Sequence, residues 1–253
     1  MKRAMTIKEV LLIFLISNFF LLISSGEAAA QEITIDLGND AENGTFSGRI
    51  IQLVALLTVL SLAPSILIMM TSFTRIVVVL SFLRTAIGIQ QTPPNTVMIS
   101  LALFLTFFIM APTFQAAYEQ GITPLVQEEI DEIEAFNRTV APFKEFMIKH
   151  VRPQDLDLFM QMSKTEEPEE IMDTPLQVLI PAFLISELRR AFEIGFMLFL
   201  PFLIIDMVTA SILMSMGMMM LPPVTISLPF KIMFFVLVDG WYLIAGSLVQ
   251  SYG

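Results

Sequence analysis

The feature that most constrains this chain is a set of apolar runs that carry almost no charge. The run from Val97 to Ala117 has no charged side chain, and the run from Ile194 to Leu221 has one, Asp206. A helix needs about 20 apolar residues to cross the hydrocarbon core of a bilayer, and both runs supply them. Only 15% of all residues are charged and the mean hydropathy is +0.76, whereas a soluble domain has about 25% charged residues. The sequence therefore predicts an all-α integral membrane protein.

The N-terminus has the three parts of a secretory signal peptide. A positive region comes first, formed by Lys2, Arg3 and Lys8. The apolar core Val10–Ile23 follows, and the small residues Ala28–Ala30 provide a cleavage site. We predict that residues 1–30 are a cleaved signal peptide and that residues 31–48 form a short extracytoplasmic segment. An uncleaved membrane anchor is the alternative.

About four apolar helices follow, and we expect them to form bent helical hairpins. The first hairpin region covers residues 49–118, with spans at Ile50–Met70 and Val97–Ala117. Between these spans lie two arginines and no acid, which favours the cytoplasmic side by the positive-inside rule; they are Arg75 and Arg84. The apolar stretch around them predicts a packed helix, which ends at the hairpin-turn prolines Pro93 and Pro94.

The second hairpin region covers residues 177–253. The charged stretch Glu187–Glu193 interrupts its first apolar run. Two spans are predicted after this stretch, at Ile194–Leu221 and Val224–Val249. The hairpin turn that joins them contains Pro222 and Pro223.

The loop at this second turn has no charge, although a short cytoplasmic turn ordinarily carries Lys or Arg. It holds instead the cluster Met218, Met219 and Met220. Methionine is flexible and polarizable, so it conforms to irregular partners. We interpret the cluster as a pore gasket to which several copies of the chain contribute. The alternative is that these methionines are ordinary core filler.

The net charge of −10 is concentrated between Glu119 and Glu187. We predict that residues 119–176 form a small acidic, helical, extracytoplasmic module. Four apolar residues at helical spacing predict the buried face of its first helix; they are Leu125, Ile130, Ile133 and Phe136. A second helix is expected after Pro153, because proline is favoured in a first turn. The one histidine, His150, is expected on the surface, and the acidity argues against binding of nucleic acid.

Three charged residues fall within the predicted spans: Asp206, Lys231 and Asp239. Charge is costly in lipid and indicates a bundle interior or a wet cavity. At 1.5 Å per helical residue, Asp206 and Lys231 lie about 16 and 12 Å from the turn, and Asp239 lies about 24 Å from it. The similar depths predict that Asp206 and Lys231 pair, within one chain or between copies, with a proton relay as the alternative. The unequal depths of the two aspartates argue against an aspartyl protease.

The rest of the sequence offers no catalytic machinery. Cysteine is absent and there is one histidine, so a thiol nucleophile, a disulfide and a cysteine-based metal site are excluded. We therefore predict no enzymatic activity, no cofactor and no metal. One weak internal similarity remains: Gly88 precedes Pro93 by the same spacing by which Gly217 precedes Pro222. This similarity indicates either two related hairpins, as in transporter repeats, or chance.

Four stretches carry a resemblance to a known family. They are MTSFTRIVVVLSFLRTAIGIQQTPPN, PFLIIDM, GMMMLPP and LPFKIMFFVLVDGW. Together they resemble the FliP family of flagellar type III export gate proteins, which is related to the SctR proteins of virulence secretion. The resemblance covers most of residues 50–253 apart from the acidic module, and the signal peptide favours the flagellar branch.

The resemblance implies a pentameric ring in the bacterial inner membrane, within the flagellar basal body. Its partners would be other copies of the chain, FliQ-like and FliR-like subunits, and FlhA-like and FlhB-like components. Its substrates would be unfolded flagellar proteins, and Met218, Met219 and Met220 match the methionine gasket of the family. The family also implies bent hairpins that lie partly above the membrane plane. The alternative function is a secondary transporter or ion channel that uses Asp206 and Lys231, and oligomeric state distinguishes the two.

Overall fold

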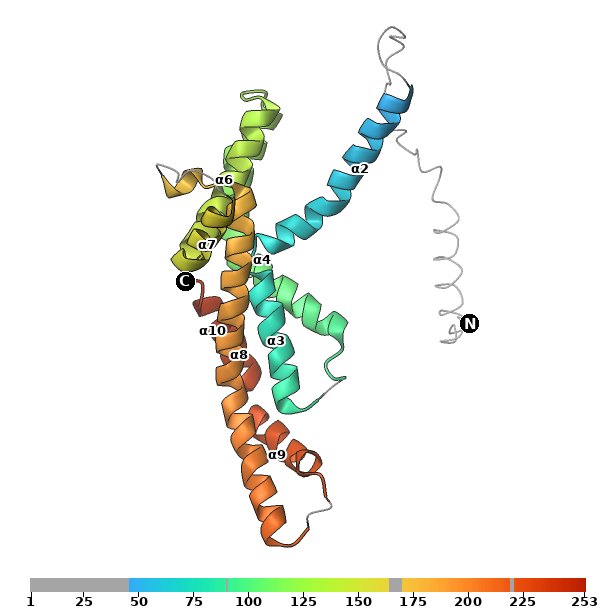
Figure 1. Cartoon of the computed structure of the whole chain (residues 1–253), viewed down its shortest axis with the longest axis vertical. Coiled ribbons are helices and arrows are strands. Elements are labelled where there is room, and N and C mark those ends of the chain that lie inside the picture. The colour runs from blue at the N-terminus through green and yellow to red at the C-terminus, as the bar shows by residue number, and fades with distance from the viewer. Residues whose placement is uncertain (1–45, 90, 164–169, 219–220) are drawn as a thin grey trace, which may run out of the picture. The chain divides into compact units, whose positions relative to one another are not determined.

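The computed structural model describes residues 46–253 except 90, 164–169 and 219–220 (Figure 1). The predicted signal peptide and residues 31–45 lie outside the described residues. The chain divides into two units, one that ends at Leu53 and one that runs from Val54 to Gly253. Every regular element in the described part of the chain is a helix, which confirms the all-helical fold class.

The first predicted hairpin region contains three helices. Helix α2 spans Phe46–Met69 and helix α3 spans Phe73–Ile87; the part of α2 from Leu53 onward is bent by 66° from α3. Helix α4 spans Asn95–Ala117 and continues through a π-helical turn and the short helix α5 to Val126. The predicted packed helix between the two spans is therefore present as α3.

Helix α8 spans Leu176–Ser215 without a break, a length of 40 residues. The charged stretch Glu187–Glu193 interrupts the apolar run of the sequence but not the helix. Its charges fit into the helix because Glu187 faces a buried arginine and Arg189 pairs with Glu193 one turn later. At 1.5 Å per residue the helix is about 60 Å long, twice the roughly 30 Å hydrocarbon core of a bilayer.

The predicted last span, Val224–Val249, consists of two helices. Helix α9 spans Pro223–Leu237 and helix α10 spans Gly240–Gln250, and the two are bent by 62°. By length and apolar composition α4–α5 and α8 are each able to cross a membrane. The two bent pairs raise that number to four if each pair is one span.

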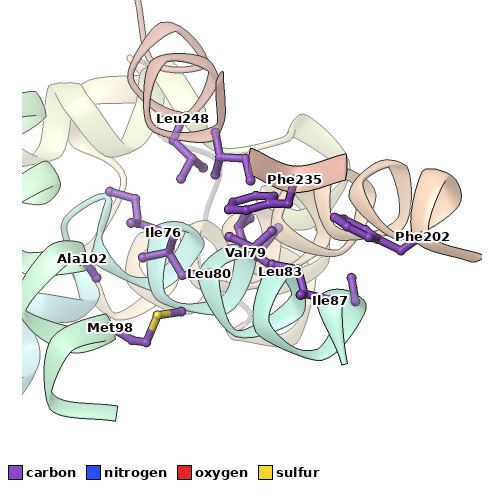
Figure 2. Close-up of a cluster of buried hydrophobic side chains, with 13 residues drawn as sticks. Ile76, Val79, Leu80, Leu83, Ile87, Met98, Ala102, Phe202, Phe235 and Leu248 are labelled. Atoms are coloured by element: carbon purple, nitrogen blue, oxygen red, sulfur yellow. The ribbon is translucent and has the colours of Figure 1, made fainter. Parts of the chain in front are cut away.

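Helix α3 lies at the centre of the first core cluster (Figure 2). Its apolar residues recur at helical spacing, so one stripe faces α8 while neighbouring positions face α4 and α9. Side chains from four helices meet this stripe. Examples are Met98 of α4, Phe202 of α8, Phe235 of α9 and Leu248 of α10.

The acidic segment folds as helix α6, Glu132–His150, followed by helix α7, Pro153–Ser163, and the 3-10 helix η2, Ile171–Asp173. The helix expected after Pro153 is thus confirmed. Helix α6 packs against α4 and α8, and α7 packs against α8. A second core cluster lies between these helices, with Met110, Phe143, Met147 and Phe183 among its members.

The predicted buried face of this segment is wrong. Glu128 has a left-handed backbone conformation (φ 58°), and α6 begins only after Asp131, whose carboxylate accepts a hydrogen bond from the Glu134 amide at 2.7 Å. This break changes the helical register between Leu125 and the residues that follow. Ile133 and Phe136 are exposed as a result, and the buried side chains include Ala135, Phe143 and Met147.

The two hairpin turns each contain a glycine with a left-handed backbone conformation. Gly88 ends α3 with φ 89°, and Gly217 follows α8 with φ 73°; glycine adopts both conformations without a steric penalty. Each glycine is followed by a proline pair, Pro93–Pro94 or Pro222–Pro223, and then by a new helix. The sequence similarity between the two hairpins therefore extends to the left-handed conformation of these two glycines.

Candidate functional site

The turn between α8 and α9 exposes its methionine side chains. Three methionines here are exposed: Met214, Met216 and Met218. Met218 is therefore not a core side chain of its own chain. Met219 and Met220 lie outside the described residues, so the gasket of three methionines remains a prediction. No charged residue occurs between Asp206 and Lys231, so this end of the hairpin is uncharged throughout.

Asp206 and Lys231 form an ion pair within one chain, as their matched depths predict. The Lys231 ammonium lies 2.6 Å from Asp206 Oδ2 and also donates to the Ala86 carbonyl oxygen of α3 at 3.2 Å. Ser227 donates its hydroxyl to Asp206 Oδ1 at 2.5 Å. The lysine side chain is almost fully buried, while 30% of the aspartate side chain is exposed. The pair therefore joins α3, α8 and α9 within the hairpin that ends in the methionine turn.

A second buried ion pair lies at the opposite end of α3. Arg75 donates to Glu187 through Nε at 2.9 Å and through Nη2 at 2.5 Å, and both side chains are fully buried. The remaining guanidinium nitrogen, Nη1, donates to the Ser251 hydroxyl at 2.9 Å and to the Ser251 carbonyl at 3.2 Å. Arg75 is thus satisfied by residues that are distant in the sequence, one on α8 and one after α10.

Tyr252 and His150 complete this buried site. The Arg75 guanidinium carbon lies 3.7 Å from the centre of the Tyr252 ring, and the Tyr252 hydroxyl donates to Glu187. Burial raises the pKa of Tyr252 well above 10.0, and the charge of Glu187 raises it further. The His150 ring lies 5.1 Å from the Tyr252 ring, and its Nδ1 is 2.8 Å from the Phe146 carbonyl oxygen.

Two predictions about these residues need correction. His150 is buried rather than on the surface, because the last turn of α6 packs against Tyr252. Arg75 is not a solvent-facing or headgroup-facing charge, because Glu187 and Ser251 bind it inside the fold. The positive-inside argument for the α3–α4 turn therefore depends on Arg84, which is only partly buried.

Arg84 forms hydrogen bonds across the turn between α3 and α4. Its Nη1 donates to the Asn95 side-chain oxygen at 2.5 Å and to the Pro93 carbonyl at 3.5 Å. Both partners are uncharged oxygens. Pro93 and Pro94 lie in this turn, and Pro222 immediately precedes α9 in the other. Each proline pair therefore lies at the start of the helix that follows its turn.

Asp239 does not lie inside a continuous span. It occupies the break between α9 and α10 with a left-handed backbone conformation (φ 51°), and its side chain is exposed. The next residue, Gly240, is packed so closely that a Cβ atom there would lie 2.1 Å from the Phe235 ring. Since the sequence alone shows only a charge in an apolar run, the break itself was not predictable from periodicity.

The long apolar helices α4–α5 and α8 define an all-helical protein of the membrane-embedded class. A sequence model of the FliP family matches residues 56–248. The flagellar biosynthetic protein FliP of Caulobacter vibrioides is 56% identical over 99% of this chain and 93% of that protein. The Bacillus subtilis protein of the same name is 60% identical over 87% of this chain and 98% of its own length. That of Aquifex aeolicus is 52% identical over 92% of this chain and 97% of its own length.

The chain therefore belongs to the FliP family and is a membrane-embedded flagellar component. The resemblance found in four short stretches extends over nearly the whole sequence.

Proposed function

We propose that this chain is a subunit of the flagellar protein export gate, and that several copies form a gated pore for unfolded flagellar proteins. The proposal places it in the bacterial inner membrane, at the flagellar basal body. FliQ-like and FliR-like subunits and FlhA-like and FlhB-like components would be its partners. Its role would be mechanical rather than catalytic, since passage of a chain needs a pore and a seal but no bond chemistry.

The observation that carries this proposal is the uncharged turn whose methionines face outward. In a single chain these side chains are exposed at the end of a hairpin, where a soluble turn would be polar. Copies arranged around an axis would bring their turns together, and flexible thioether side chains would close the opening. The same flexibility would let the seal deform around passing chains of different sequence.

The length of α8 supports assembly of several copies. A helix about 60 Å long extends well beyond a bilayer core of roughly 30 Å. Large apolar side chains are exposed along α8, including Phe192, Phe196, Met197, Met207 and Val208. Lipid covers only the part within the bilayer, so neighbouring subunits would cover the rest. We infer that the helical hairpins are assembled partly above the membrane plane.

The transporter alternative needs Asp206 and Lys231 to exchange protons or ions. In this structure both are already bound, one by Ser227 and the other by the Ala86 carbonyl. These contacts favour a structural role for the pair. The native mass of the detergent-purified complex separates the two functions, because an export gate requires several copies and a transporter places its site within one chain.

Replacement of Met218, Met219 and Met220 together by Ala tests the seal. Each substitution removes most of a side chain, and a gap in a packed apolar contact is not closed by backbone movement alone. The complex is expected to assemble normally, while cells that contain it become permeable to small ions or dyes. Leucine at the same positions preserves volume and should keep the cells sealed at rest. A fully assembled triple-Ala complex that leaks no more than the parent would contradict the gasket.

A further inference from the structure

Asp239 presents a carboxylate that the described residues leave without a hydrogen bond or an ion pair. It lies in an apolar environment, because its exposed neighbours include Leu237, with 78% of its surface exposed, and Tyr242, with 74% exposed. The break that holds it is well defined: the left-handed conformation of Asp239 is followed by a glycine that Phe235 contacts closely. Phe235 itself points into the core cluster around α3 (Figure 2).

Most charged side chains on the apolar helices are already paired, so few basic residues remain as candidate partners of Asp239. Between Val54 and Gly253, acids and bases of α3, α8 and α9 form three pairs: Arg75 with Glu187, Arg189 with Glu193, and Lys231 with Asp206. Two described bases on these helices have no carboxylate partner, Arg84 and Arg190. Arg190 acts electrostatically on Tyr252, at the end of the molecule where Arg75 lies. Among the described residues, the Arg84 guanidinium donates its hydrogen bonds to the uncharged oxygens of Asn95 and Pro93.

Arg84 and Asp239 lie at a similar level of the helices. An apolar pocket of about 250 Å³ is lined by Arg84 together with Val236 and Trp241, which flank Asp239 in the sequence. Asp239 itself does not line this pocket, and its carboxylate does not meet the Arg84 guanidinium within the described part of the chain. Rotation about an axis normal to the membrane preserves depth, so Arg84 of one copy and Asp239 of the next lie at a similar depth in a ring.

We propose that Asp239 of one copy forms an ion pair with Arg84 of the neighbouring copy. This inference rests on the proposed assembly of several copies and specifies one of its contacts. An exposed carboxylate among apolar side chains is costly unless a base neutralises it. A guanidinium with free donors provides a strong, directional partner for a carboxylate. The contact is head-to-tail, because a base of one copy would meet an acid of the next, and such contacts give a ring when the rotation between copies closes.

Cysteine cross-linking tests the contact directly, because the natural chain has no cysteine. Arg84→Cys and Asp239→Cys would be introduced together into the full-length protein, produced with the other components of the flagellar export apparatus. Mild oxidation is expected to give dimers and a ladder of larger species on a denaturing gel. The matched control is Arg190→Cys with Asp239→Cys, which should remain monomeric. If the cysteines at positions 84 and 239 form a disulfide only within one copy, or form none, the proposal is overturned.

Two further experiments, co-production of the single cysteine variants and charge reversal, test the contact between copies. Co-production of the two single variants permits only a bond between different copies, so dimers from that mixture exclude an intrachain bond. Charge reversal at either position alone, Arg84→Glu or Asp239→Arg, should lower the amount of assembled complex at least about tenfold. The double reversal should restore much of it, and a double variant no better than the singles would contradict the pairing.

The native mass of the parent complex separates this inference from the proposed function. A parent that assembles as an oligomer but gives no 84–239 cross-link refutes the contact and leaves the export gate intact. A parent that purifies as a single copy refutes both.

Discussion

Lys231 joins three helices through one ammonium group, and its removal has a predictable cost. In Lys231→Ala or Asp206→Ala, the remaining charge loses its partner in a largely apolar site. A buried pair broken in this way costs about 3–5 kcal/mol, and somewhat less here because Asp206 is partly exposed. Each variant should therefore show a lower yield of assembled complex and a lower midpoint of thermal denaturation.

The exchanged pair Asp206→Lys with Lys231→Asp should recover only part of this loss. The Ala86 carbonyl accepts a hydrogen bond from the lysine in the parent, but it repels a carboxylate placed at position 231. Ser227→Ala serves as the mild control, since it removes one hydrogen bond worth about 1 kcal/mol. Single variants that assemble normally but do not export would instead support a proton relay.

His150 makes stability dependent on pH in a definite direction. Burial lowers the pKa of His150 below 6.5, and the nearby Arg75 charge lowers it further, while the Phe146 carbonyl and Glu187 act in the opposite direction. Below pH 6.5 the unfolded chain therefore takes up a proton that the folded chain does not, so the free energy of unfolding decreases as the pH falls. His150→Phe keeps a ring beside Phe146 and Tyr252 but cannot titrate.

The midpoint of thermal denaturation in detergent, measured at pH 7.5 and 5.5, checks this expectation. The parent should lose more stability than His150→Phe on acidification, because the carboxylates titrate in both proteins and only the histidine differs. Equal losses in the two proteins would show that His150 does not contribute.

At the scale of helices, the contact between α3 and α8 depends on Gly195. A Cβ atom at this position would lie 2.6 Å from Cδ2 and 2.8 Å from Cγ of Phe82, so Gly195→Ala should force the helices apart at a cost of about 1–3 kcal/mol. Gly246→Ala in α10 is the matched control, because nothing lies within 4 Å of its added Cβ. Thermal denaturation should separate the two variants, and equal midpoints would mean that Phe82 moves aside freely.

The ends of several helices could be predicted from local chemistry, but their packing partners could not. Proline pairs end or begin helices through sterics that operate within a few residues, so the turns at Pro93 and Pro222 followed from the sequence. The Asp206–Lys231 pair also followed, because both lie near one short turn. Arg75 and Glu187 are separated by 112 residues, and no local pattern indicates such a contact. The same holds for His150, whose burial depends on Tyr252.

For the whole molecule, the orientation in the membrane is the central prediction. A reporter that is active only outside the cytoplasm should be active when fused after Ser163, in the acidic segment. The same reporter fused after Gln91 should be inactive, because the α3–α4 turn with Arg84 is expected on the cytoplasmic side. The two fusions flank α4, which is long and apolar enough to cross the membrane. The reverse pattern of activity would invert the topology.

The exposed methionines of the α8–α9 turn also make the protein chemically sensitive. Oxidants convert a thioether to a sulfoxide, which is polar, and they reach exposed sulfur first. Met214, Met216 and Met218 should therefore be oxidised before the buried Met98, Met110 and Met147. A seal made of these side chains would become wettable at peroxide doses that leave the helical core intact. The exposed thioethers that would let the turn seal a pore are therefore also the groups most sensitive to oxidation.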